Sequence, residues 1–418
     1  MFPTWPPSPP GIEPPSMPTL VALLSFLGVF SALGWLTFLG HLILHRDQAV
    51  FLADLPDAPP PQGWPTLAVA FAARDEAGGV EAATRSMLAQ DYPGLEVIAV
   101  DDRSVDATGA ILDAIEGENP RLRVVHVRDL PAGWLGKTHA LQRASEATEA
   151  RWLLLTDADV IFEPGALKRA VGFAEANGLG HLTLGPGVPT ESAGERLFLG
   201  LFGLLFAIGA PLGKVADMKS KASVGIGAFN LVRLESFRAI GGFGHLALSV
   251  DDDMRLGQAM KFAGYRPRLL LGNGAVSVRW QVGLGGMIRG LEKNFYAASG
   301  FRPALAALGG CLIAVVGLSP FVGLFVGPMA TRVVCGLGIA ALVALFAGTN
   351  RQSGIPWYYA FAVPLATVAL LAALIRSVVL TLARDGVIWR GHYYPLAELK
   401  RHVRLRDAWT REVWKSTR

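Results

Sequence analysis

The sequence has little charge and almost no cysteine. Only 17% of its 418 residues are charged, and its two cysteines, Cys311 and Cys335, both lie inside apolar runs. Because neither a CxxC spacing nor a histidine cluster is present, a disulfide framework or a zinc site is not expected, and both thiols are interpreted as buried in helices. The eight histidines show no ligand spacing. The net charge of +4 is too small to imply general nucleic-acid binding.

The first residues also lack the basic segment with which a secretory signal peptide begins. Eight of the first eighteen residues are proline, and only Glu13 is charged. Residues 1–18 are therefore expected to form an extended, poorly ordered arm.

Apolar residues, by contrast, make up 51% of the chain. The run Thr19–Leu44 is long enough to cross a bilayer, which takes about 20 helical residues. A transmembrane helix is therefore predicted over 19–45. Arg46 follows this run and no basic residue precedes it, so the positive-inside rule places the next domain in the cytoplasm of a cell-membrane protein.

Three more apolar runs follow residue 300. Pro303–Val326, Ala330–Ala347 and Trp357–Ala383 are candidate spans, and 301–383 is expected to hold two or three transmembrane helices. The juxtamembrane tail, 384–418, carries nine Arg or Lys against four Asp or Glu and should prefer the cytoplasm. Three crossings would leave that tail outside, and the sequence does not decide between these requirements.

Residues 64–300 have a different pattern. Short apolar runs such as LAVAFAA and LEVIAVDD alternate with stretches of helical period such as GGVEAATRSMLAQ. Strands and helices that alternate at this spacing predict an α/β domain with a Rossmann-like, mostly parallel sheet covered on both faces.

Two acidic motifs close expected strands, where open α/β sheets bind ligands. Asp101-Asp102 ends LEVIAVDD and could accept hydrogen bonds from a base or ribose, or cap a helix. Asp157 and Asp159 end RWLLLTDAD. Two carboxylates so close together are costly unless a cation compensates them. They are therefore expected to bind Mg²⁺ or Mn²⁺ on a diphosphate, with helix capping as the alternative.

A third acidic motif, Asp251-Asp252-Asp253, opens the expected helix MRLGQAMKFAG. Acidic residues favour a helix N-terminus, but three of them exceed what capping needs. Their mutual repulsion would raise the pKa of one carboxyl, as a general base requires. The apolar stretch Leu197–Leu212 lies between the second and third motifs. A crossing there would separate them, so this stretch is interpreted as an interfacial or buried helix that could help admit a lipid.

Taken together, the motifs resemble family 2 glycosyltransferases with the GT-A fold. ARDEAGGVEAATRSMLAQDYPGLEVIAVDDRSVDAT is similar to the opening of these enzymes, and LLLTDAD is similar to their DxD strand. GAFNLVRLESFRAIGGF resembles their acceptor-side segment, and DDDMRLGQAMKFAGY resembles their ED-xx-L helix. The resemblance covers about Leu67 to Ala298. With the flanking apolar runs, the nearest subgroup is the ceramide-glucosyltransferase-like and hopanoid- or carotenoid-associated enzymes.

The resemblance implies a donor site for a nucleotide-sugar, most simply a UDP-sugar. Arg74, Glu76 and Asp102 would contact the nucleoside, with Asp101 beside it. Lys137, in GWLGKTHAL, would face the diphosphate or the sugar, unless it is a solvated surface lysine.

The resemblance also implies the metal site and the base. Asp157 and Asp159 would hold the metal on the diphosphate. Asp252 and Asp253 align with the Glu-Asp pair of the family, so Asp253 would be the base and Asp251 a helix cap. The implied reaction is one direct displacement at the anomeric carbon, with inversion, onto a hydroxyl of a membrane lipid.

Two departures from the family pattern bear on the expected function. The QxxRW motif of processive members is absent; MIRGLEKNFYA stands in its place, which favours a single transfer. Arg279-Trp280 and Lys293-Asn294 could do related work, or could be an interfacial anchor and a helix surface. Aspartate also replaces the glutamate of the Glu-Asp pair.

The tail segment VIWRGHYYPL resembles one that follows the last span in lipid-modifying relatives. Trp389, Arg390, Tyr393 and Tyr394 could line a membrane-side entrance, although an interfacial anchor is the preferred interpretation. Two alternatives to a lipid glycosyltransferase stay open, namely a processive polysaccharide synthase and a non-catalytic membrane scaffold with the same fold.

Overall fold

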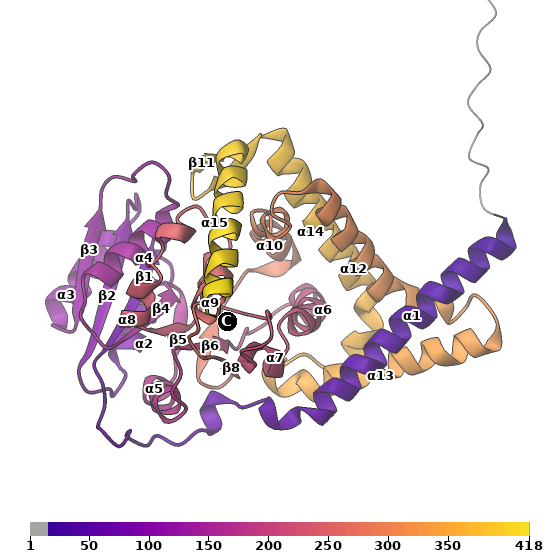
Figure 1. Ribbon diagram of the computed structural model, residues 1–418, viewed down its shortest axis with the longest axis horizontal. Helices are drawn as coiled ribbons and strands as arrows, with labels where there is room; N and C mark the ends of the chain where they lie inside the picture. Colours follow the sequence, from indigo (N-terminus) through magenta and orange to yellow (C-terminus); the bar gives the residue numbers. More distant parts are fainter. Residues whose placement is uncertain (1–15, 418) are drawn as a thin grey trace, which may run out of the picture.

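The computed structural model describes residues 16–417, in which an α/β domain lies beside a group of long apolar helices (Figure 1). Residues 1–15 of the expected arm and the last residue of the tail lie outside the described residues. The arm prediction is wrong at its end. Helix α1, Met17–Leu44, already begins at Met17 and has Pro18 in its first turn, where a missing N–H breaks no helical hydrogen bond.

The α/β domain is built on a seven-stranded sheet in the order β3-β2-β1-β4-β7-β6-β8. β7 runs antiparallel to both of its neighbours, and the other pairings are parallel, which confirms the expected fold class. The strands are β1 Leu67–Ala73, β2 Leu95–Asp102, β3 Leu122–Val127, β4 Trp152–Asp157, β6 His181–Gly185, β7 Asn230–Arg233 and β8 Pro267–Leu271. A small antiparallel sheet adds β5 Val160–Phe162 and β9 Val276–Val278.

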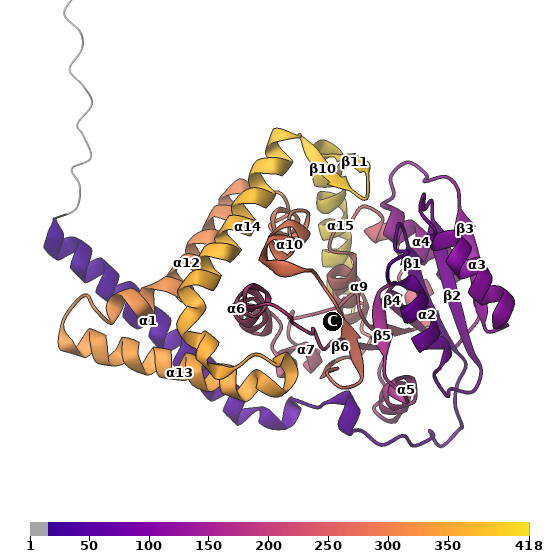
Figure 2. The ribbon, with the colours of Figure 1, turned by 180° about the vertical axis from the view of Figure 1, so that it is seen from behind.

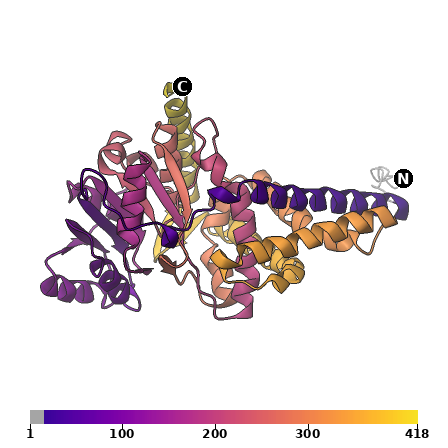
Figure 3. The same cartoon turned by 90° about the horizontal axis from the view of Figure 1, so that it is seen from below.

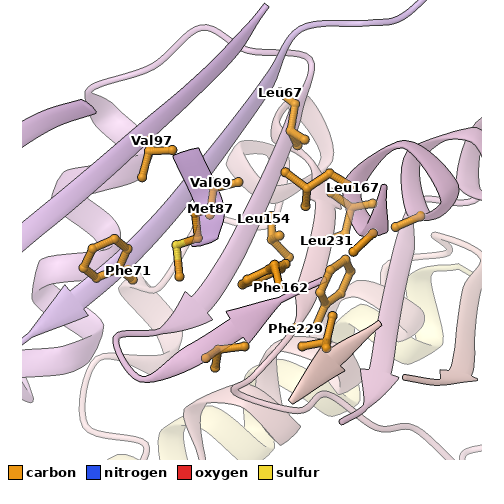
Figure 4. Packing of buried hydrophobic residues seen from close by; sticks show 14 of the residues in the cluster. Leu67, Val69, Phe71, Met87, Val97, Leu154, Phe162, Leu167, Phe229 and Leu231 are labelled. Carbon is orange, nitrogen blue, oxygen red and sulfur yellow. The ribbon is translucent and has the colours of Figure 1, made fainter. Parts of the chain in front are cut away.

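Helices cover both faces of the large sheet because its strands are apolar on both sides. Along β1, Leu67, Val69 and Phe71 pack on one face, where Figure 4 shows them with Met87, Leu154 and Phe229. Ala68 and Ala70 pack on the other face. The covering helices are α2 Val80–Leu88, α3 Thr108–Glu118, α4 Gly136–Glu146, α5 Ala166–Ala176, α8 Leu234–Ala239 and α9 Asp252–Phe262.

Between the α/β domain and the long helices lies a layer of shorter helices, visible from behind in Figure 2. The predicted helix at Leu197–Leu212 is α6, Ala193–Gly209, which starts at a capping box formed by Ser192 and Glu195. It packs against α10 and α14. The other members of this layer are α7 Leu212–Ala216, α10 Gly283–Gly290 and α11 Asn294–Ala298.

Within residues 16–417, four helical segments are long and apolar enough to cross a membrane. They are α1, α12 Pro303–Gly323, α13 Met329–Ser353, and α14 Val363–Ala383 with the short helix η4 Trp357–Ala362 before it. Figure 3 shows α1 and α13 projecting together from one side of the molecule. After α14 the chain forms the hairpin of β10 Gly386–Trp389 and β11 His392–Pro395, followed by α15 Leu396–Ser416.

Candidate active site

The carboxyl ends of three parallel strands bring most of the predicted donor residues to one edge of the sheet. In register, Ala72 of β1 lies beside Asp157 of β4, and Ala73 lies beside Asp101 of β2. A cavity of about 580 Å³ opens at this edge. The predicted residues that line it are Arg74, Glu76, Asp102, Lys137, Asp157 and Asp159.

The other walls of the cavity come from later parts of the chain. Trp280 and Gln281 precede α10, while Arg289 and Lys293 lie at and just after its end. Thr381 and Arg384 belong to the end of α14. Trp389, Arg390 and Tyr394 belong to the hairpin. The cavity therefore reaches from the acidic ends of the strands to the layer of shorter helices and the end of α14.

Lys137 lies at the centre of the carboxylate cluster, so it is not a solvated surface lysine. Its Nζ lies 2.6 Å from Asp157 Oδ1 and 3.6 Å from Asp252 Oδ2. Burial alone would lower the pKa of Lys137, but the carboxylates of Asp157, Asp252 and Asp253 outweigh burial and raise it above its ordinary value. Lys137 is therefore a fixed positive charge at the place where the acidic motifs converge.

Asp252 and Asp253 lie behind Lys137, and neither is among the described residues that line the main cavity. Asp253 Oδ2 accepts a hydrogen bond from Gly227 N at 2.7 Å, and its Oδ1 accepts one from its neighbour Met254 N. Burial raises the pKa of both Asp252 and Asp253, against the attraction of Lys137. Mutual repulsion, which the sequence offered as the cause for one carboxyl, is a smaller contribution than burial.

Gly227 allows the acceptor-side loop to approach this cluster closely. A Cβ at Gly227 would lie 2.7 Å from Asp157 Oδ2 and 3.3 Å from both Asp253 Oδ2 and Lys137 Nζ. A larger residue would therefore displace one of the charged groups. The loop before β7 thus joins the second and third acidic motifs.

Asp159 is the other half of the predicted metal pair. Burial, together with the neighbouring carboxylates of Asp157 and Glu76, raises the pKa of Asp159 to about 6. A positive ion between Asp157 and Asp159 would relieve this repulsion.

Asp101 and Asp251 are not where the sequence places them. Asp101 turns away from the cavity, accepts a hydrogen bond from Ser104 N, and lies 3.0 Å from His126 Nδ1. Asp251 precedes α9 as expected, but its side chain makes no capping hydrogen bond. It pairs instead with Arg255 and with Arg406 of α15. Asp251 therefore ties the tail helix to the α/β domain.

Trp389, Arg390 and Tyr394 of the hairpin line the cavity, whereas the sequence favoured an interfacial anchor for them; Tyr393 does not line it. Arg390 forms an ion pair with Glu76, and Lys293 Nζ lies 4.2 Å from the centre of the Trp389 ring. The sequence offered two signals, the run of aromatic and basic residues in the tail and its resemblance to a segment of lipid-modifying relatives. Nothing in it indicates that the tail returns to the strand ends.

Comparisons with known proteins identify the family of the domain that carries these residues. Residues 69–241 match the model of glycosyl transferase family 2, so the chain carries a glycosyltransferase domain of that family. This stretch holds the first two acidic motifs, Lys137 and Gly227. The third motif lies just beyond it.

Two curated relatives match part of the chain. Beta-monoglucosyldiacylglycerol synthase of Synechocystis sp. is 30% identical over 131 residues, which cover 31% of this chain and 27% of that protein. Succinoglycan biosynthesis protein ExoO of Rhizobium meliloti is 34% identical over 114 residues, covering 27% of this chain and 31% of that protein. The chain thus spans less than a third of the length of either relative.

A solved glycosyltransferase structure shares the fold. The mannosyltransferase PcManGT from Pyrobaculum calidifontis, in complex with GDP-Man and Mn²⁺, aligns with a TM-score of 0.53 and 17% identity. The alignment covers 82% of this chain and 99% of that one. It establishes a GT-A-like fold for this chain.

Proposed function

We propose that this protein is an inverting glycosyltransferase that moves a sugar from a nucleotide-sugar, most simply a UDP-sugar, to a hydroxyl of a membrane lipid. The observation that carries the proposal is a single cavity that joins the carboxylates of Asp157 and Asp159 to the end of α14. A polar donor and a lipid headgroup could therefore meet in one space. The match to Beta-monoglucosyldiacylglycerol synthase, whose name describes a glucolipid, supports the choice of acceptor.

The donor site fits a divalent cation, Mg²⁺ or Mn²⁺. Asp157 and Asp159 offer hard oxygen ligands, and after burial the carboxylates of Asp157 and Glu76 contribute to the raised pKa of Asp159. Among residues 16–417, no group of three or more potential metal ligands is found. Two carboxylates completed by diphosphate and water oxygens are, however, a usual arrangement for Mg²⁺. The bound ion would stabilise negative charge on the leaving diphosphate, and the Mn²⁺ in the fold relative is consistent with this.

The side chains of this protein would supply the remaining chemistry. Lys137 would place a positive charge beside the diphosphate, and Arg74, Glu76 and Asp102 would hold the nucleoside. Asp253 would take the proton of the acceptor hydroxyl. Each of its oxygens keeps a lone pair beyond the backbone hydrogen bond that it accepts, and its raised pKa makes it a stronger base.

The long apolar helices beside the catalytic domain support a position of this domain at the membrane surface. The four apolar helical segments indicate a membrane protein, and we propose that it is a multi-pass protein. Arg46 after α1 supports a catalytic domain on the cytoplasmic face.

The test is sugar transfer from radiolabelled UDP-glucose or UDP-galactose to lipids in proteoliposomes with Mn²⁺. We expect one sugar added per acceptor lipid, in the anomeric configuration opposite to that of the donor. Retention of configuration would overturn the single displacement with Asp253 as base.

A polysaccharide synthase is the second candidate, because ExoO is described by polymer biosynthesis. It would yield a polymer that grows with time in the same assay. A scaffold with the same fold would release no nucleotide under any condition.

A further inference from the structure

The hairpin after α14 is held firmly against the end of that helix. The single hydroxyl proton of Tyr393 lies between two carbonyl acceptors, with its Oη 2.7 Å from Asp385 O and 3.1 Å from Arg384 O. A Cβ on Gly386 would lie 2.4 Å from the Tyr393 ring and 2.5 Å from Tyr394 O. The hairpin therefore has a fixed position relative to α14.

The tip of the hairpin is a tight turn with an arginine in a backbone conformation that favours glycine. Arg390 has φ 50° and Gly391 has φ 74°. Hairpin turns of this kind normally carry Asn or Asp followed by Gly, and a long side chain at positive φ is costly. Such strain is often retained where a side chain must point in one direction. Here the direction is into the cavity.

The hairpin touches both walls of the cavity. Arg390 pairs with Glu76, on the wall formed by the strand ends. The ring of Trp389 lies under Lys293, on the opposite wall, which is formed by the residues after α10. Gly136 N, at the start of α4, donates a hydrogen bond to the hydroxyl of Tyr394 at 3.4 Å. Trp389, Arg390 and Tyr394 of the hairpin thus contact both walls of the cavity.

Arg390 has more hydrogen-bond donors than its contact with Glu76 uses. A guanidinium has five N–H donors in a planar fork that matches phosphate oxygens. Within residues 16–417, the contacts of Arg390 are with Glu76, through one nitrogen. The pair also lines the same cavity as Asp157 and Asp159. A diphosphate held at Asp157 and Asp159 would therefore lie near the free edge of the guanidinium.

We propose that Arg390 is a donor-binding residue, whose guanidinium binds the diphosphate of the nucleotide-sugar while Glu76 orients it and the hairpin closes the donor site. The proposal rests on the proposed function, because it names a further contact for the same donor. It assigns to the tail, more than three hundred residues from Glu76 in the sequence, a direct part in substrate binding.

The test is titration of UDP with Mn²⁺ into the detergent-purified full-length protein. Arg390→Ala should bind UDP about 10- to 100-fold more weakly, as expected for the loss of a charge-assisted contact. Arg390→Lys keeps the charge without the fork and should fall in between. The matched control is Arg404→Ala, which removes an exposed arginine of α15 and should bind as the wild type does.

A second comparison separates direct contact from bracing of Glu76. If Arg390 touches the donor, Arg390→Ala should weaken UDP binding further in a Glu76→Gln background. If the double variant binds as tightly as Glu76→Gln alone, Arg390 acts only through Glu76 and the proposal is overturned. Protection of the wild-type Arg390–Gly391 bond from trypsin by UDP and Mn²⁺ is expected too, and it does not depend on how any variant folds.

Failure of this proposal and failure of the proposed function have different signatures. If the wild type binds neither UDP, GDP nor dTDP with any metal, the proposed function fails and this contact fails with it. If the wild type binds UDP and Arg390→Ala binds it equally well, only the role of Arg390 is overturned.

Discussion

At the scale of single residues, Lys137 balances a cluster that would otherwise repel itself. Its contacts with Asp157 and Asp252 are close, and the side chain of Lys137 is only 21% exposed. We expect Lys137→Met to abolish transfer and to lower the free energy of unfolding by about 2 kcal/mol. This is less than the roughly 3–5 kcal/mol for a fully buried pair, because Asp157 is partly open to solvent.

The measurements are sugar transfer and thermal unfolding in detergent. Adding Asp157→Asn to Lys137→Met should restore part of the stability and none of the activity, since one of the repelling charges is removed together with a proposed metal ligand. Lys221→Met, at an exposed position, is the control. A Lys137→Met protein as active as the wild type would exclude Lys137 from the site.

His181 gives the protein a pH dependence that is independent of catalysis. It is fully buried in β6, its Nε2–H donates to Asn230 Oδ1, and burial lowers its pKa from 6.5 to about 4. In the unfolded chain the His181 imidazole binds a proton below pH 6.5, whereas in the folded protein it binds one only below about pH 4. The contribution of His181 to the free energy of unfolding therefore falls as the pH drops through this window, by an amount on the order of 3 kcal/mol, whereas the raised pKa values of Asp159 and Asp252 act in the opposite direction.

Apparent melting temperatures between pH 7.5 and pH 4.5 test this expectation. His181→Gln should flatten the profile in part, because His402, whose pKa is also lowered to about 4, still contributes. An equal slope for the variant and the wild type would mean that His181 takes up no proton on unfolding.

Consecutive residues also show where reasoning from the sequence could have gone further. Asp101 and Asp102 follow one another at the end of β2, and neighbouring side chains of a strand point to opposite faces. Only one of them can face the cavity, and it is Asp102. The period of the strand excludes the paired assignment without any structure.

At the scale of elements, small residues set the spacing of the long helices. A Cβ on Gly338 of α13 would lie 2.5 Å from Ala32 Cβ and 2.7 Å from Ala32 Cα in α1. Helices inside a membrane gain stability from such close approach. We expect Gly338→Ala to destabilise the protein by about 1–3 kcal/mol, the usual range for overpacking.

Gly348→Ala is a matched control in the same helix, because a Cβ there would meet nothing within 4 Å. Melting temperatures and the monodisperse fraction after extraction should fall for Gly338→Ala alone. Equal behaviour of the two variants would show that α1 and α13 do not depend on this contact.

The elements divide clearly into those that the sequence predicts and those that it does not. Strands and helices of the α/β domain follow from local periodicity, so β1, β2 and β4 lie where LAVAFAA, LEVIAVDD and RWLLLTDAD indicate. In the sequence, the hairpin appeared as an aromatic and basic run that resembles a segment of lipid-modifying relatives. Its role depends on contacts between distant segments, such as Arg390 with Glu76, which no local pattern encodes.

At the scale of the whole molecule, we propose two spans after the catalytic domain instead of three. Before α14, Gln352 donates a hydrogen bond to Gly185 O and Arg351 pairs with Asp54. After α14, Arg384 pairs with Glu292 and Arg390 pairs with Glu76. The end of α13 before α14 and the residues that follow α14 therefore both contact the catalytic domain or its adjoining segments. Hydropathy alone could not show this, because it records composition and not the path of the chain.

Labelling of single cysteines with an impermeant maleimide in sealed, oriented vesicles tests this topology. In a background without Cys311 and Cys335, we expect Trp357→Cys and Ser416→Cys to react from the same side. Met329→Cys, at the far end of α13, should react from the opposite side. Reaction of Trp357→Cys and Ser416→Cys from opposite sides would mean that α14 crosses the membrane.

The donor site is the part of the account on which the other proposals depend. The most direct measurement is UDP binding to the purified protein with and without Mn²⁺, for the wild type and for Asp159→Asn. We expect metal-dependent binding by the wild type and its loss in Asp159→Asn, because that change removes one of the two proposed metal ligands. Equal binding by both proteins, or binding that does not respond to metal, would contradict a metal-assisted donor site at Asp157 and Asp159.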